Sequence, residues 1–163
     1  RTPMETLRVS VLVLGTIGVG LIAGVFYGWA VSVMPGLGRS DDRTFVVAFR
    51  AMDRAIVRLP FVSVFVGALV LTAGAVPLHL GAEHRDALPW TFAAFVLYLL
   101  SFVFTVRVNI PLNNALQAAG DIDGIDAGEA RARFDEVKWN RWHGVRTALC
   151  VAALVCMVVA LTV

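Results

Sequence analysis

The segment RVNIPLNN places polar and helix-breaking residues at the end of a long apolar run: Arg107, Asn109, Pro111 and Asn113. An amide buried without a partner costs on the order of 2–7 kcal/mol, so polar groups at the edge of a membrane span are functional candidates. Proline lacks an N–H donor, so we expect Pro111 to end or kink the helix and to let Asn109 and Asn113 face inward. Alternatively, these asparagines satisfy the carbonyls that such a break leaves free.

A second polar group combines two indole rings, an imidazole and a guanidinium: Trp139, Trp142, His143 and Arg146. Their spacing of i, i+3, i+4 and i+7 places them on one face of a helix. Together with asparagine amides, such a set suits a flat, polarisable, oxygenated ligand. Two alternatives stay open, because the tryptophans could belong to an interfacial belt and Arg146 could reach out to lipid headgroups.

The composition indicates which elements must position these residues. Of the 163 residues, 58% are hydrophobic and only 16% are charged, and the mean hydropathy is +0.77. Soluble domains have about 45–50% apolar and roughly 25% charged residues, so the chain is predicted to be an integral membrane protein that contacts the lipid bilayer. A net charge of +2 predicts no nucleic-acid partner.

Four apolar runs have the length of membrane spans, about 20 residues each. They predict a single all-α domain, a four-transmembrane-helix bundle with spans at 7–34, 60–80, 89–107 and 145–163. The segment 127–146 is expected to form a helical extension into the fourth span, with Glu129/Arg133 and Arg131/Asp135 pairs.

The first run carries Gly20, Gly24 and Gly28 at intervals of four residues. Small residues at that spacing let another helix approach closely, so we expect helix packing there, including a homo-oligomer contact, rather than a passage for a ligand.

Between the first two spans, residues 38–59 predict an amphipathic helix that lies in the membrane interface, with Asp41 or Asp42 as its cap. Arg50, Arg54 and Arg58 recur on its polar side and are expected to face anionic headgroups. The lone acid Asp53 is expected to pair with Arg50 or Arg54, and a catalytic role for it is the weaker alternative.

The basic residues predict the orientation. Four spans place the connections 35–59 and 107–146 on one side, with eleven Arg and Lys residues against three (Arg1, Arg8 and Arg85) on the other. Both connections are therefore expected in the cytoplasm and both termini outside, in a bacterial inner or plasma membrane. The Pro35 turn, RVNIPLNN and the Trp139–Arg146 face then share one side, where they can form one pocket.

These motifs resemble a family of small four-helix membrane proteins that includes the anthrone oxygenases of aromatic polyketide biosynthesis. The resemblance rests on GVFYGWAVSVMPGL at 24–37, FRAMDRAI at 49–56, VNIPLNNAL at 108–116 and WNRWHGVRT at 139–147. Asp53 stands where the family often has asparagine.

The resemblance implies that O2 oxygenates a CH2 group of a hydrophobic, anthrone-like molecule to a carbonyl, without flavin, haem or nicotinamide. His143 would be the base, because an ordinary histidine pKa of about 6.5 suits proton removal near neutrality. Asn109 and Asn113 would stabilise the oxyanion, with charge from Arg146 or Arg107. Trp139 and Trp142 would stack on the rings, and Pro111 would help to shape the site.

Two other functions compete with this one. A metal-dependent redox enzyme could use the same bundle, but no Glu-x-x-His pair lies within a span, and no metal ligand is assigned. His79 and His84 fall at the opposite end from His143, and the Glu83-His84 loop pair is expected to be solvated. A non-catalytic membrane subunit or lipid-binding bundle is the third reading.

Overall fold

A computed structural model describes residues 2–81, 83 and 85–163 of the chain. Arg1 and His84, which the sequence analysis used, lie outside these residues. The helical segments are, in chain order, α1 (Pro3–Gly28), η1 (Trp29–Val33), α2 (Met34–Gly38), α3 (Asp42–Ile56), α4 (Leu59–Leu78), α5 (Leu88–Phe104), η3 (Thr105–Asn109), α6 (Ile110–Gln117), α7 (Ala127–Phe134) and α8 (Glu136–Ala160).

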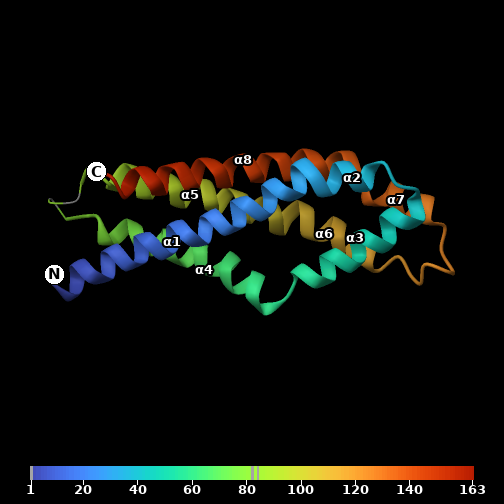
Figure 1. Cartoon of the computed structure of the whole chain (residues 1–163), viewed down its shortest axis with the longest axis horizontal. Helices are drawn as coiled ribbons and strands as arrows, with labels where there is room; N and C mark the ends of the chain where they lie inside the picture. The colour runs from blue at the N-terminus through green and yellow to red at the C-terminus, as the bar shows by residue number, and fades with distance from the viewer. Residues whose placement is uncertain (1, 82, 84) are drawn as a thin grey trace.

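Four helical stretches of the described chain are long and apolar enough to cross a membrane, which confirms the predicted four-span helical bundle. They cover Pro3–Gly38, Leu59–Leu78, Leu88–Gln117 and Ala127–Ala160. The start of α1 and the end of α8 lie at the same end of the elongated bundle (Figure 1). The chain is thus an integral membrane protein.

The first and third spans are longer than predicted, because their prolines do not end the helices. Pro35 and Pro111 each lie in the first turn of a short α-helix that directly follows a π-helical turn. The N–H of Met34 reaches back five residues to Trp29, and the N–H of Ile110 does the same to Thr105. A local change of winding accommodates the missing donor of proline, and π-turns of this kind often occur at functional sites.

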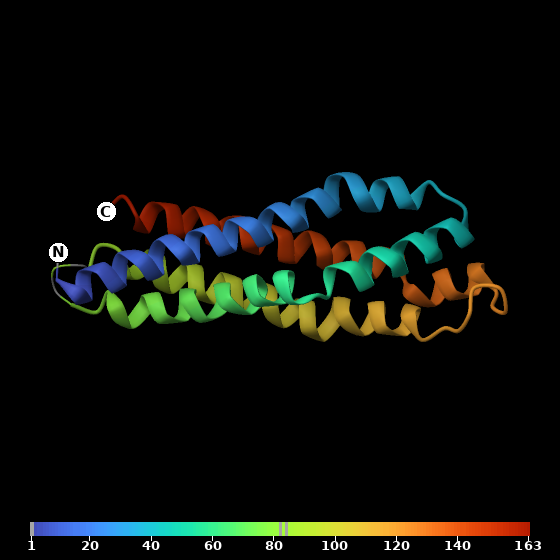
Figure 2. The same ribbon diagram turned by 60° about the horizontal axis from the view of Figure 1, so that its bottom comes forward.

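Helix α3 follows the long axis of the bundle and continues toward α4 after a break at Val57 and Arg58 (Figure 2). Asp41 caps it by accepting from the backbone N–H of Thr44 at 3.0 Å, as predicted. The Thr44 hydroxyl also donates to Asp41, and these bonds hold the pKa of Asp41 below its usual value.

The predicted headgroup contact of Arg50 is wrong. Arg50 is buried, and it donates to the carbonyls of Leu116 at 2.7 Å and Gly120 at 2.9 Å. Arg54 remains exposed at the surface but donates to the side chain of Gln117 at 3.0 Å. The reason is that α3 packs on α6 and α7, so its basic side covers protein, and only Arg58 remains exposed without such a contact.

The predicted continuous helix over 127–146 breaks at Asp135, which adopts a left-handed conformation (φ 53°, ψ 65°) and caps α8 by accepting from the Lys138 N–H. The Glu129–Arg133 ion pair is confirmed. The predicted Arg131–Asp135 ion pair is wrong, because the break turns Asp135 away. Arg131 instead pairs with Glu136 at 2.8 Å and Asp42 at 3.0 Å. These pairs join α7 and α8 to the start of α3.

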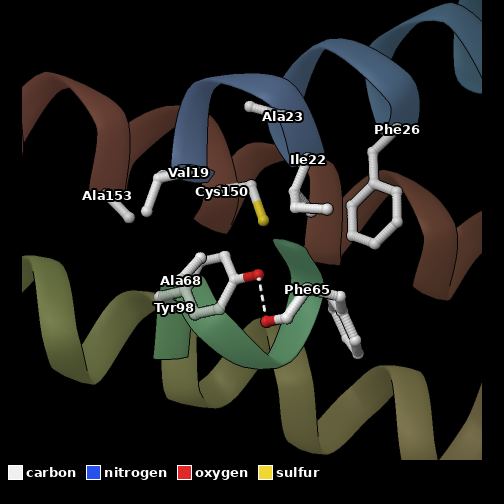
Figure 3. Packing of buried hydrophobic residues seen from close by; sticks show 9 residues of the cluster. All are labelled: Val19, Ile22, Ala23, Phe26, Phe65, Ala68, Tyr98, Cys150 and Ala153. Carbon is white, nitrogen blue, oxygen red and sulfur yellow. Dashed lines mark hydrogen bonds between the residues drawn. The ribbon is translucent and has the colours of Figure 1, made fainter. Parts of the chain in front are cut away.

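Two apolar clusters stabilise the two halves of the bundle around the site. In the half that contains most of α1 and α4, the helices α1, α4, α5 and α8 meet around Tyr98, whose hydroxyl donates to the carbonyl of Phe65 at 2.9 Å (Figure 3). In the other half, Phe45, Phe49, Phe134 and Trp139 form an aromatic cluster that joins α3, α7 and α8.

The closest helix contacts of α1 fall at glycines other than the predicted ones. A Cβ built at Gly18 would lie 3.3 Å from the Cβ of Ala68, and one at Gly15 would lie 2.9 Å from Met157 Cε. At Gly20 it would meet Leu154 at 3.5 Å, whereas at Gly24 and Gly28 it would meet no described atom within 4 Å. Contact between copies of the chain through Gly20, Gly24 and Gly28 stays a prediction.

Candidate active site

A cavity of about 240 Å³ lies where the two halves of the bundle meet. Its wall is mainly apolar, and the aromatic rings that line it come from α1, η1, α3, α4, α5 and α8: Phe26, Trp29, Phe49, Phe61, Phe65, Phe102 and Trp139. Both π-turns contribute to the wall, through Trp29 in η1 and Thr105 and Val106 in η3. The π-turns that accommodate the prolines therefore form part of the cavity wall.

The mouth of the cavity is apolar and lies on the side of the bundle. Val57 and Val62, at the break between α3 and α4, line the cavity and are 65% and 38% exposed. Val106 and Ile110, on the facing η3 and α6, also line it and are 42% and 38% exposed. The opening therefore lies between the second and third spans.

His143 lies buried in the wall with both ring nitrogens engaged. Its Nδ1 is 2.8–3.0 Å from the Arg146 guanidinium, and its Nε2 is 2.8 Å from the carbonyl oxygen of Phe26. Arginine can only donate and a carbonyl can only accept, so these partners require a neutral ring with its proton on Nε2. The ring also stacks on Trp139, with centroids 4.7 Å apart and planes at 13°.

Arg146 brings a buried positive charge to the cavity. Besides His143, it donates to the hydroxyl of Thr105 at 3.1 Å, and its guanidinium lies 4.2 Å from the Phe26 ring centroid. It forms no ion pair with any carboxylate of the described residues. A desolvated cation with unused N–H donors favours a ligand that carries or develops negative charge.

Asn113 connects α8 to α3 at the cavity wall. Its carbonyl oxygen accepts from the indole N–H of Trp139 at 2.7 Å, and its amide N–H donates to Asp53 at 2.7 Å. Because an indole can only donate, this contact fixes which way the amide points.

Asp53 is the lining residue that the sequence analysis assigned to a surface pair. It is buried, and its two carboxylate oxygens accept from Asn113 and from Gln117, the latter at 2.9 Å. The predicted pairing with Arg50 or Arg54 is wrong, since both arginines are directed to α6 and its C-terminal loop. One feature of the sequence points to Asp53: it is the one acid among the arginines in the second half of α3.

The structure brings together Asn113, Trp139, His143 and Arg146 at the cavity, but it places the other predicted site residues elsewhere. Asn109 is buried behind Trp139 and donates to its backbone carbonyl at 3.3 Å, while its own side-chain oxygen has no hydrogen-bond partner among the described residues. The remaining three are Trp142, which packs on Phe104 at 4.7 Å, and Arg107 and Pro111, which are exposed.

Helix winding explains these differences. Trp142 lies at the edge of the stripe that Trp139, His143 and Arg146 share. It therefore packs on Phe104 at the end of α5, outside the cavity. The π-turn at η3 adds a residue to one turn and so shifts the angular position of the residues around it. Among the described residues, no three His, Cys, Asp or Glu side chains gather where they could hold a metal ion.

Comparison with known proteins identifies a family for this chain. A family model described as anthrone oxygenase matches residues 45–156, more than half of the chain, and the match includes Asp53, Asn113, Trp139, His143 and Arg146. Comparisons with curated proteins and with solved structures give no match. By the extent of the family match, the chain belongs to the anthrone oxygenase family.

Proposed function

We propose that this protein uses O2 to oxygenate an acidic CH2 group of a hydrophobic, anthrone-like aromatic molecule. The observation that carries the proposal is the cavity, in which aromatic walls surround the buried cation Arg146 in a member of this family. A volume of about 240 Å³ lies near the lower end of the roughly 300–1,000 Å³ typical of small-molecule pockets. It suits a compact, flat ligand held by its ring faces.

The overall reaction converts CH2 and O2 into C=O and H2O. Removal of one proton leaves the electron pair of the C–H bond on the carbon, delocalised into the neighbouring carbonyl as an enolate. The enolate is electron-rich enough to react with O2. Arg146 stabilises the developing enolate oxygen through N–H donors that protein groups leave unused, and the apolar wall limits water.

His143 acts on this reaction through Arg146. Because its Nδ1 accepts from the guanidinium and its Nε2 is bonded to Phe26, the ring keeps no free lone pair for the substrate. Its role in the proposal is to hold Arg146 in place and, by stacking, to orient Trp139. A base other than His143 is needed.

The test uses the purified protein in lipid nanodiscs with anthrone as the probe. We expect conversion to the quinone, with one atom of ¹⁸O2 in the new carbonyl and the other in water. Arg146→Gln should lower the rate by about 100-fold or more, the size of effect seen when an oxyanion donor is removed, whereas the exposed Arg141→Gln on the same helix should leave it unchanged. Circular dichroism checks that both variants fold.

Absence of ¹⁸O from the quinone, or equal rates for Arg146→Gln and wild type, would refute the proposal. A metal-dependent enzyme on the same bundle is the second candidate, and elemental analysis of the same sample tests it. A stoichiometric transition metal whose removal abolishes the rate would favour that candidate.

The orientation is part of the proposal. From the basic connections, we propose that the half of the bundle that holds α3 and α7 lies in the cytoplasm, with both termini outside. Labelling of a cysteine introduced at Asp123 in intact cells, compared with one at Arg8, tests it.

A further inference from the structure

We infer that Asp53 is the general base that removes the proton from the substrate CH2 group. The inference rests on the proposed function and adds the residue that starts the reaction. Asp53 is the only carboxylate among the described residues that line the cavity. It lies there with the aromatic walls and Arg146, so a ligand in the cavity can contact both charges.

The contacts of Asp53 use its carboxylate oxygens as acceptors only. Both partners, Asn113 at 2.7 Å and Gln117 at 2.9 Å, donate their amide N–H groups to it. The two bonds fall on different oxygens of the carboxylate. Each oxygen uses one of about two acceptor positions in this way, so lone pairs remain for a substrate proton.

Both amides are themselves fixed by other parts of the protein. Trp139 donates to Asn113, Arg54 donates to the oxygen of Gln117 at 3.0 Å, and Gln117 donates a further hydrogen to the Arg50 carbonyl at 3.0 Å. Neither amide can therefore rotate to present its oxygen to Asp53 without breaking these bonds. The carboxylate is oriented by α6 and α8 although it belongs to α3.

Arginines close in sequence do not neutralise Asp53. Arg50 is held by two carbonyls, and Arg54 is held by Gln117. A carboxylate in an ion pair is a weaker base, because the neighbouring cation stabilises its charged form. The arrangement of α3 against α6 thus leaves a buried, hydrogen-bonded carboxylate without an ion-pair partner among the described residues.

Asp53 alone can carry out every proton transfer in the proposed reaction. Asp53 takes the first proton, and O2 forms a C–O bond with the carbanion to give a peroxide anion. Protonated Asp53 returns that proton to the outer oxygen. It then takes the second C–H proton, whose electron pair forms the C=O bond as the O–O bond breaks. The departing hydroxide takes the proton from Asp53 and leaves as water.

The experiment separates proton removal from oxygenation. Anthrone is incubated without O2 in D2O with the full-length protein in nanodiscs, and NMR measures deuterium entering its CH2 group above the uncatalysed rate. Wild type should accelerate the exchange. Asp53→Asn should lower the acceleration by about 100-fold or more, in the range of general-base effects, whereas the exposed Asp121→Asn should match wild type.

Three further measurements complete the test. Asp53→Glu should recover part of the exchange rate, and acetate should restore exchange to Asp53→Gly in a concentration-dependent way, which a purely structural role would not produce. Arg146→Gln should keep anthrone-dependent quenching of tryptophan fluorescence, and so should Asp53→Asn, because the aromatic wall is intact in both. Circular dichroism confirms that each variant is folded.

The outcomes distinguish the two claims. If wild type exchanges and oxygenates but Asp53→Asn exchanges at the wild-type rate, the assignment of Asp53 is overturned and the proposed function stands. If wild type oxygenates anthrone without accelerating exchange, proton removal by Asp53 is likewise overturned. If wild type does neither, the proposed function itself fails. Loss of exchange in Asp53→Asn with rescue by acetate supports the assignment.

Discussion

The hydrogen bond between Trp139 and Asn113 offers a quantitative test of the cavity wall. The indole N–H donates to the amide oxygen at 2.7 Å, and Trp139 is only 2% exposed. Trp139→Phe removes the donor and leaves the amide oxygen without its partner. Asn113→Leu removes the acceptor and leaves the indole N–H unpaired. The double variant Trp139→Phe/Asn113→Leu removes both groups together.

The expected magnitude follows from what each change leaves behind. A buried polar group without a partner costs about 1–3 kcal/mol, whereas loss of both partners is nearly neutral for the bond itself. Trp139→Phe also weakens packing on Phe49 and Phe134, whose ring centroids lie 5.6 and 6.0 Å away. That packing loss is common to the single and double variants, so it cancels in the cycle. Two such penalties arise in the single variants and neither arises in the double variant, so the double variant should be less destabilised than the sum of the single variants by about 2 kcal/mol or more.

The assay is titration of the protein in mixed micelles with dodecyl sulfate, which gives the free energy of unfolding from circular dichroism. Trp142→Phe combined with Asn113→Leu is the matched control, because Trp142 packs on Phe104 outside the cavity. Effects of independent sites add within about 0.3–0.5 kcal/mol. If the coupling energy between Trp139→Phe and Asn113→Leu is no larger than the coupling energy in the control cycle, the indole–amide bond does not stabilise the cavity wall.

The remaining predictions concern helix packing, a buried hydroxyl, a helix cap and the cavity mouth. Gly18→Leu should lower the free energy of unfolding by about 1–3 kcal/mol through overpacking, because a Cβ there already meets Ala68 at 3.3 Å. Gly24→Leu, which meets no described atom within 4 Å, should be neutral or stabilising by up to about 1 kcal/mol in the same titration, and equal losses would contradict the packing. Tyr98→Phe should cost about 0.6 kcal/mol and no more than about 1.7 kcal/mol, the average and the maximum for hydrogen bonds between membrane helices, and an unchanged value would mean that the bond adds no stability. Asp135→Ala should cost about 2 kcal/mol from the cap and the left-handed backbone, with Asp135→Asn within about 0.5 kcal/mol of wild type; similar values for the two variants would refute this. Ile110→Trp should narrow the mouth and lower the initial oxygenation rate about tenfold, equal to roughly 1.4 kcal/mol, and an unchanged rate would place the entrance elsewhere.

The spans were predictable from the sequence because their signal is composition over a long window. The limits of the spans were not, since Pro35 and Pro111 were read as ends. Proline removes one donor, and whether the helix stops or takes a π-turn depends on what packs around it. Here η1 and η3 line the same cavity. This arrangement arises from the tertiary structure, so it cannot be predicted from either segment by itself.

Local periodicity explains the part of the site that could be predicted. Trp139, His143 and Arg146 lie on one helix face, and topology alone brings Asn113 to the same end of the bundle. Asp53 shows the limit of this reasoning. Its partners, Asn113 and Gln117, lie 60 and 64 residues away in the chain. A basic amphipathic pattern predicts an interface helix even when, as here, two of its arginines bind α6 and its C-terminal loop instead of headgroups.

The lateral, apolar mouth between the second and third spans has a consequence for kinetics. Under the proposed function, a hydrophobic aromatic substrate partitions into the lipid, and the reaction rate then depends on the mole fraction of substrate in the bilayer. At a fixed total amount of substrate, added lipid dilutes the substrate and slows the reaction even though the aqueous volume is constant. The quinone is also apolar and collects in the same phase, so its accumulation there should inhibit in proportion to turnover per unit of membrane.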